Sequence, residues 1–179
     1  EGMRQKRIQW NWLWMGGGAL LFLAFTLMNC GKKVTQVQRG GIAEAAIATY
    51  VAPGDLDEYY LFYSGGHSGN VYVAGIPSMR HISTIPVFTP YPATGYGFDK
   101  DSKEMLGGYT WGDAHHPSIS ETNGDYDGRW LFISDNANNR MARIDLRDFK
   151  TKQIFGPIPN VSGNHCSSFV TPNTEYVLA

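Results

Sequence analysis

The sequence contains few of the residues and motifs that mark common enzyme classes. Only two cysteines, Cys30 and Cys166, occur among its 179 residues, and it has no Cys-X-X-Cys pair, HExxH motif or phosphate-binding glycine loop. The standard zinc, redox and nucleotide motifs are therefore excluded. Composition leaves a Ser/His/Asp hydrolase open, but no Gly-X-Ser-X-Gly elbow supports one.

The chain also lacks an excess of charge of either sign. Its 15 Lys and Arg residues and 16 Asp and Glu residues give a net charge of -1, and basic residues gather only near the N-terminus. Because a phosphate-binding surface normally needs a basic stripe, we expect no nucleic-acid partner. The 42% hydrophobic content is typical of a globular protein, and 21 glycines and 10 tyrosines predict short strands joined by tight turns.

Basic residues precede an apolar stretch, Trp12 to Met28, near the N-terminus. This pattern predicts an export signal or hydrophobic anchor helix over residues 1–30, with Met3 as the start, followed by a polar linker over residues 31–50. The folded part, residues 51–179, would then lie outside the cytoplasm. Membrane contact is expected only through the leader.

The end of this leader, Leu27 to Gly31, resembles a lipoprotein signal with a lipidated Cys30. Asn29 departs from the small residue expected before that cysteine. Lipidation, ordinary signal-peptidase cleavage and an uncleaved anchor therefore all stay open. Because Cys30 ends the leader, no structural disulfide with Cys166 is expected.

Short alternating runs bounded by Gly, Asn, Asp and Pro begin at Tyr59 and predict two similar three-strand meanders. Leu61 and Leu131 lie 70 positions apart, as do Val71 and Met141. The predicted strands are 59–64, 70–74 and 81–85, then 129–134, 140–144 and 152–155. A third copy begins at 174–178.

A period of about 45 residues with four strands per unit is typical of a β-propeller blade. The first two copies lie 70 positions apart rather than about 45, and an insertion at Pro90 to Leu106 accounts for the difference. The innermost strands would be 117–120 and 167–170, each preceded by histidine. The fold class expected is all-β, the first blades of a propeller behind an N-terminal hydrophobic helix.

Three of the five histidines lie at the starts of these innermost strands: His115, His116 and His165. Innermost strands surround the propeller axis, so their first residues should converge. Neutral imidazole binds copper, zinc, iron and nickel, which makes the three histidines candidate metal ligands. In an extended strand His115 and His116 would point to opposite sides and could serve two ions. Hydrogen-bonded structural histidines remain the alternative.

Five segments together resemble the N-terminal part of nitrous-oxide reductase, in the clade II branch exported by the general secretory (Sec) route. They are Asp57–Gly69, Gly75–Arg80, Gly112–Pro117, Tyr126–Arg140 and Ile158–His165, and the resemblance runs in order from about Ala52 to the end. Lys6-Arg7 is not a twin-arginine motif, which fits that branch.

The resemblance implies a seven-bladed propeller whose hub holds a four-copper, sulfide-bridged centre through seven histidines. His115, His116 and His165 match the first three, so copper is the expected cofactor. The other four, and a C-terminal cupredoxin domain with a two-copper electron-entry site, would lie beyond Ala179. The chain is therefore expected to be an N-terminal fragment, inactive alone. The family also allows for calcium in the complete enzyme.

The implied activity is the reduction of nitrous oxide to dinitrogen and water in denitrification. The implied setting is the periplasm, with a c-type cytochrome or cupredoxin as electron donor and a homodimer as the working form. A non-catalytic extracytoplasmic propeller that binds a ligand or protein is the alternative function.

Four further residues carry expectations of their own. Asp113 is expected either to orient an imidazole and assist protonation or to be a simple turn residue. His67 would be structural or channel-lining, His81 should face solvent at the start of an outer strand, and Cys166 should be a small buried residue.

Overall fold

The computed structural model describes residues 42–165 and 168–179, which fall in two compact units, Glu1–Ala45 and Ala46–Ala179. The predicted leader, Cys30 and Cys166 lie outside the described residues. Helix α2, Ile42–Thr49, occupies part of the predicted linker. Within the described residues, no helix is long and apolar enough to cross a membrane.

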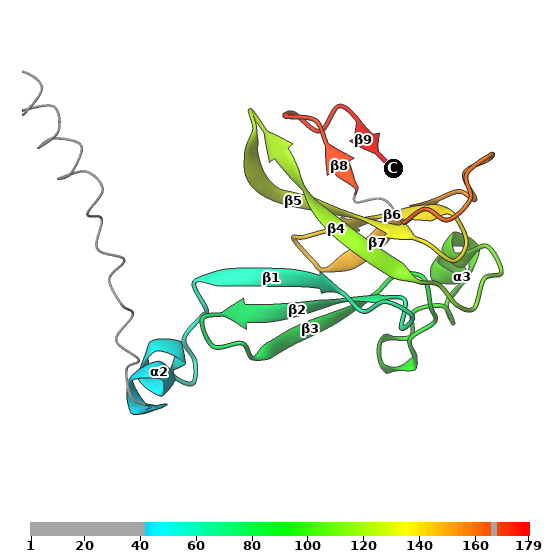
Figure 1. Ribbon diagram of the computed structural model, residues 1–179. Helices are drawn as coiled ribbons and strands as arrows, with labels where there is room; N and C mark the ends of the chain where they lie inside the picture. Colours follow the sequence, from blue (N-terminus) through cyan, green and yellow to red (C-terminus); the bar gives the residue numbers. More distant parts are fainter. Residues whose placement is uncertain (1–41, 166–167) are drawn as a thin grey trace, which may run out of the picture. The chain divides into compact units, whose positions relative to one another are not determined.

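The second unit consists mostly of antiparallel strands in sequential order (Figure 1). The first sheet contains β1 (Tyr59–Ser64), β2 (Asn70–Ile76) and β3 (His81–Pro86). The second contains β4 (Ala114–Thr122), β5 (Asp125–Asp135), β6 (Arg140–Asp145) and β7 (Lys150–Phe155), and the third β8 (Phe169–Val170) and β9 (Val177–Leu178). All six strands predicted for the two meanders fall inside these bounds.

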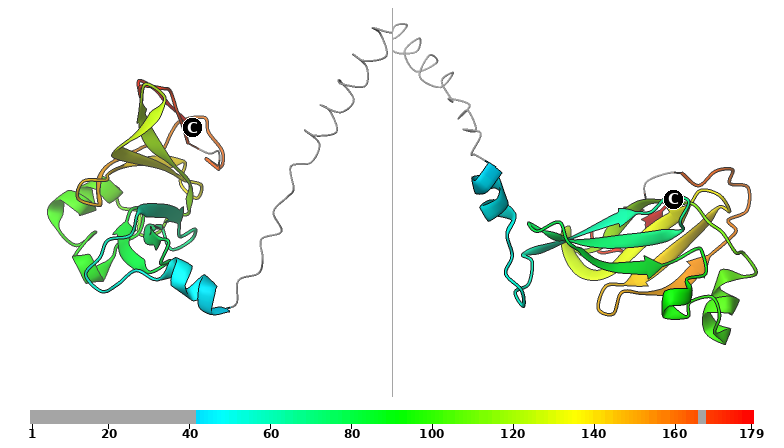
Figure 2. Two further views of the ribbon diagram at one scale, coloured as in Figure 1. Left: turned by 90° about the vertical axis from the view of Figure 1, so that its left-hand side faces the viewer. Right: turned by 90° about the horizontal axis from the view of Figure 1, so that it is seen from below.

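The first two sheets share one hydrophobic core, and they lie against each other in both views of Figure 2. Alternate residues of the central strands point into it, such as Val71 and Val73 of β2 and Leu131 and Ile133 of β5, all without solvent exposure. Burial of apolar side chains is the main favourable term in folding. This core therefore fixes the second sheet, and with it β4, against the first.

The predicted insertion forms a short 3-10 helix, Pro92–Thr94, and helix α3, Lys100–Leu106. Asp99 caps α3, because its Oδ1 accepts a hydrogen bond from the backbone N–H of Ser102 at 2.9 Å. Gly107 ends the helix with φ 63°, a left-handed conformation that glycine adopts readily. The insertion was predicted, but its helix was not.

A buried carboxylate anchors the first sheet. Asp57 Oδ1 accepts from the backbone N–H of Ser78 at 2.9 Å, and Oδ2 from Arg80 Nε at 2.7 Å. Burial disfavours the charged form, but these donors hold the pKa of Asp57 below its ordinary value. An alanine Cβ at Gly75 would overlap the Asp57 carboxylate, so only glycine fits there.

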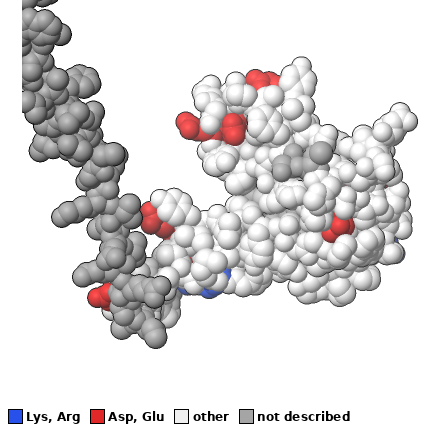
Figure 3. All heavy atoms as spheres, in the orientation of Figure 1, with Lys and Arg blue, Asp and Glu red and all other residues white. Residues whose placement is uncertain are grey.

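Large apolar side chains remain exposed on the edge strands β1 and β8. They include Tyr59, Tyr60, Leu61 and Tyr63 of β1 and Phe169 of β8. Figure 3 shows few charged side chains among the described residues on the face that it displays. Exposed, contiguous apolar surface of this kind is typical of a region that contacts other protein.

Candidate metal centre

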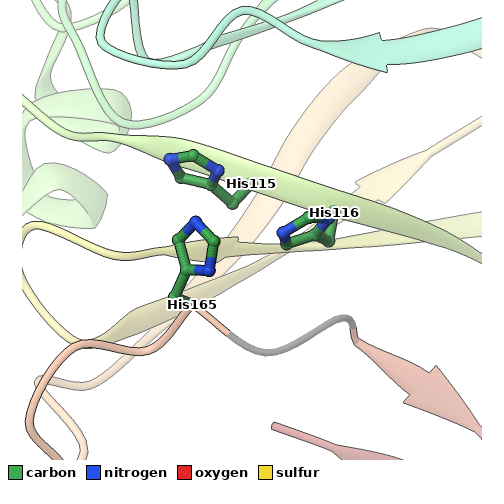
Figure 4. Close-up of side chains that lie close together, drawn as sticks. All are labelled: His115, His116 and His165. Atoms are coloured by element: carbon green, nitrogen blue, oxygen red, sulfur yellow. The ribbon is translucent and has the colours of Figure 1, made fainter.

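The structure brings His115, His116 and His165 together (Figure 4). One ring nitrogen from each lies within 4.8 Å of the other two. The ring centroids of His115 and His165 are 4.4 Å apart, and those of His116 and His165 are 5.0 Å apart. His115 and His116 come from β4, whereas His165 comes from the loop after β7, so the cluster joins segments about 50 residues apart.

The prediction that His115 and His116 point to opposite sides of an extended strand is wrong. Their ring centroids are 5.6 Å apart, and both rings reach the same cluster. The register between β4 and β5 shifts between His115 and Ser118, and His116 has φ 50°. A bulge with a left-handed residue breaks the alternation of an extended strand, so both imidazoles turn the same way.

Asp113 lies behind the His115 imidazole. Its Oδ1 is 2.9 Å from His115 Nε2, and its Oδ2 accepts from Asn136 Nδ2 at 3.2 Å. Burial alone would raise the pKa of Asp113, but the hydrogen bonds from Asn136 and His115 bring it below its ordinary value. A carboxylate in this position fixes the orientation of an imidazole. With Nε2 facing the carboxylate, Nδ1 is the His115 nitrogen left for a metal.

His67 does not join the cluster but lies against the same Asp113 oxygen as His115. Its Nδ1 lies 3.4 Å from Asp113 Oδ1, and its side chain is 78% exposed. The ring stacks on Trp111 with centroids 5.6 Å apart, and Trp111 Nε1 donates to the His67 carbonyl at 3.1 Å. His81 is exposed at the start of β3, as predicted. No sequence signal marks Trp111 as the partner of His67.

The first sheet is tied directly to the start of β4. The backbone N–H of Ala114 donates to the carbonyl of Gly66 at 2.9 Å. Gly112 packs so closely on Phe88 that an alanine Cβ would overlap the Phe88 Cβ. The histidine-bearing end of β4 is therefore held by a main-chain hydrogen bond at Ala114 and by close side-chain packing at Gly112.

The chemistry of the donors suits a transition metal. Three imidazole nitrogens without a carboxylate among them favour copper, zinc or nickel over calcium or magnesium. His116 and His165 are exposed, so other ligands can approach the same ion. The cluster offers part of a coordination shell and leaves positions for further ligands.

No family model matches this chain. It is 46% identical over 166 residues to the nitrous-oxide reductase of Pseudomonas fluorescens, an alignment covering 90% of this chain and 26% of that protein. It is 45% identical over 142 residues to the nitrous-oxide reductase of Stutzerimonas stutzeri, covering 77% of this chain and 22% of the relative. The chain is 40% identical over 133 residues to the nitrous-oxide reductase of Cupriavidus necator, an alignment covering 70% of this chain and 20% of that protein.

The chain thus spans about a quarter of the length of the curated relatives it matches. The identity extends over most of this chain in each alignment, which confirms the resemblance seen in the sequence motifs. This chain is homologous to the N-terminal region of nitrous-oxide reductase.

Proposed function

We propose that this chain supplies His115, His116 and His165 as ligands to the copper centre of a nitrous-oxide reductase. The observation that carries the proposal is the convergence of these three imidazoles in a chain 46% identical to such an enzyme over 166 residues. Imidazole is a good ligand for copper, and the donor set fits it.

Copper bound here would supply the electrons and the binding site for reducing nitrous oxide with two electrons and two protons to dinitrogen and water. The residues of this chain orient the ligands. Asp113 Oδ1 lies 2.9 Å from His115 Nε2, a charge contact that leaves Nδ1 for the cluster. The exposure of His116 and His165 leaves room for the remaining ligands of the complete protein and for substrate.

A seven-bladed propeller is the architecture that we propose for the complete domain. The second sheet runs in sequential order from β4 to β7, as a blade does. One groove is lined by residues of β1, β4 and β8, among them Leu61, Ile119 and Phe169, so the first strands of three sheets lie near one another. The exposed apolar residues of β1 and β8 suit contacts with further blades.

The remaining features of the function belong to the complete protein. We propose a four-copper, sulfide-bridged centre completed by four further histidines, and a cupredoxin domain with a two-copper electron-entry site. We also propose export by the Sec route to the periplasm, attachment to the membrane through the leader or Cys30, and a homodimer that takes electrons from a c-type cytochrome or cupredoxin. Calcium is a further proposed ion.

The test replaces each clustered histidine with alanine in the complete protein, with His81→Ala as the control. His81 is an exposed histidine of β3 outside the cluster. We expect His115→Ala, His116→Ala and His165→Ala to lose histidine-bound copper, measured by metal analysis and visible absorption, and to lose reductase activity. The control should keep both. Wild-type copper content in all four variants would refute the proposal and favour a non-catalytic binding protein.

A further inference from the structure

The turn between β5 and β6, Asp135–Arg140, is bonded to the segment that precedes His115. The backbone N–H of Asp113 donates to Asp135 Oδ1 at 2.8 Å, and the backbone N–H of Asn136 donates to the Asp113 carbonyl at 2.9 Å. Asn136 Nδ2 donates to Asp113 Oδ2 at 3.2 Å, and Asn138 Nδ2 to the Trp111 carbonyl at 2.8 Å. Three side chains of one turn therefore hold the backbone and carboxylate on which His115 depends.

The same turn also holds the segment that precedes His165. Asn139 Oδ1 accepts from the backbone N–H of Gly163 at 2.8 Å and from that of Asn164 at 3.1 Å. Asn164 Nδ2 donates to the Arg140 carbonyl at 3.2 Å, and the Asn164 side chain is buried. The residue after Asn164 is His165.

The turn itself is held rigidly. Asp135 and Arg140 are 0% and 1% exposed, and Arg140 Nε donates to Asp135 Oδ2 at 2.7 Å. Arg140 Nη1 also donates to the Leu106 carbonyl at 3.1 Å. Asn139 has φ 53°, a left-handed conformation that asparagine tolerates better than most residues. The turn can therefore serve as a fixed reference for both segments.

We infer that the Asp135–Arg140 turn sets the spacing of the histidine cluster, with Asn139 and Asn136 as positioning residues. Asn139 acts on His165 through Gly163 and Asn164, and Asn136 acts on His115 through Asp113. One short turn thus holds the 4.4 Å approach of the His115 and His165 rings. The inference rests on the proposed function, because it assigns these asparagines to the copper site.

Metal sites lose affinity when the groups that orient their ligands are removed. Asn139→Gly is the sharpest test, since glycine adopts the same positive φ and removes the side chain that carries the Oδ1 acceptor. Its matched control is Asn123→Gly, because Asn123 lies in the turn between β4 and β5 with φ 55° and holds neither histidine-bearing segment. Both variants make the same chemical change at the same kind of turn position.

The measurement is copper(I) affinity of the complete protein, by competition with a chromophoric copper(I) chelator. We expect Asn139→Gly to bind copper about tenfold more weakly than the control and to shift the visible spectrum of the histidine-bound copper. Asn139→Asp should restore both, because a carboxylate oxygen can accept the same two backbone bonds. Thermal unfolding should show Asn139→Gly to be less stable than the control, because two backbone N–H groups lose their acceptor, so copper affinity is compared well below both unfolding midpoints.

Wild-type affinity and spectrum in Asn139→Gly would overturn the inference. If that variant does not fold, Asn136→Ala decides instead, because it removes the bond to Asp113 Oδ2 and keeps the backbone N–H. Wild-type copper affinity in Asn136→Ala would then overturn the inference. Retention of copper by His115→Ala and His165→Ala would show that the proposed function fails, which is a distinguishable result.

Discussion

Replacing Gly112 with alanine should displace the start of β4 and weaken both the fold and the copper site. The added Cβ would overlap the Phe88 Cβ and lie 3.1 Å from both Phe88 Cγ and Asp135 Oδ2. Non-bonded carbon atoms prefer about 3.5–4.0 Å. Phe88 and Asp135 are both 0% exposed, so they have no room to retreat. The segment that carries Asp113 must move instead.

The magnitude follows from two contributions. Overpacking a filled site costs about 1–3 kcal/mol. A shift of the segment by about 1 Å would take the 2.8 Å bond from Asp113 N–H to Asp135 Oδ1 out of hydrogen-bond range, and a bond to a charged group is worth about 1.5–3 kcal/mol. We therefore expect the free energy of unfolding to fall by about 3 kcal/mol and copper affinity to fall about tenfold or more.

The assay combines chemical denaturation with copper(I) competition on the complete protein. Gly124→Ala is the control, because a Cβ there would meet nothing within 4 Å, although its φ of 82° makes alanine strained. The control should lose about 1–2 kcal/mol and bind copper normally. Equal unfolding free energies and equal copper affinities in the two variants would refute the reasoning from close packing at Gly112.

Two further predictions concern buried charges. Arg140→Leu leaves Asp135 buried without its cation and should lower the free energy of unfolding by about 3–5 kcal/mol. Lys100→Leu breaks an ion pair with Glu104 in which the side chains are 84% and 69% exposed, and should cost much less. Similar losses in denaturant titrations would contradict this. Asp57→Asn should destabilise the protein at neutral pH. The pKa of Asp57 is lower in the folded protein than in the unfolded chain, so the ionised carboxylate stabilises the fold at pH values above the unfolded-state pKa of about 3.9. The difference in free energy of unfolding between this variant and the wild type should shrink as the pH falls through the folded-state pKa of Asp57. A difference that stays constant from pH 7 to pH 3 would contradict the prediction.

The strands were predictable because their signals are local. Tyr59 to Ser64 and Arg140 to Ile144 are short runs rich in apolar or aromatic residues between turn residues, and both form strands with nearly the expected bounds. Helix α3 also has a local signal, because Asp99 caps its N-terminus by accepting from the backbone N–H of Ser102. This helix lies inside the segment that was predicted only as an insertion. Local hydrogen bonding and side-chain alternation are properties of the chain itself, so the sequence carries them directly.

The sequence by itself determined which residues could hold a metal, since His115, His116 and His165 stand out by type and by their place in the repeat. Only the tertiary structure decided how they face one another. The bulge at His116 turns two rings to one side, and the Asp135–Arg140 turn bonds to backbone atoms more than 20 positions away, at Asp113 and Gly163. Such long-range contacts depend on how the sheets pack, and no local pattern specifies them.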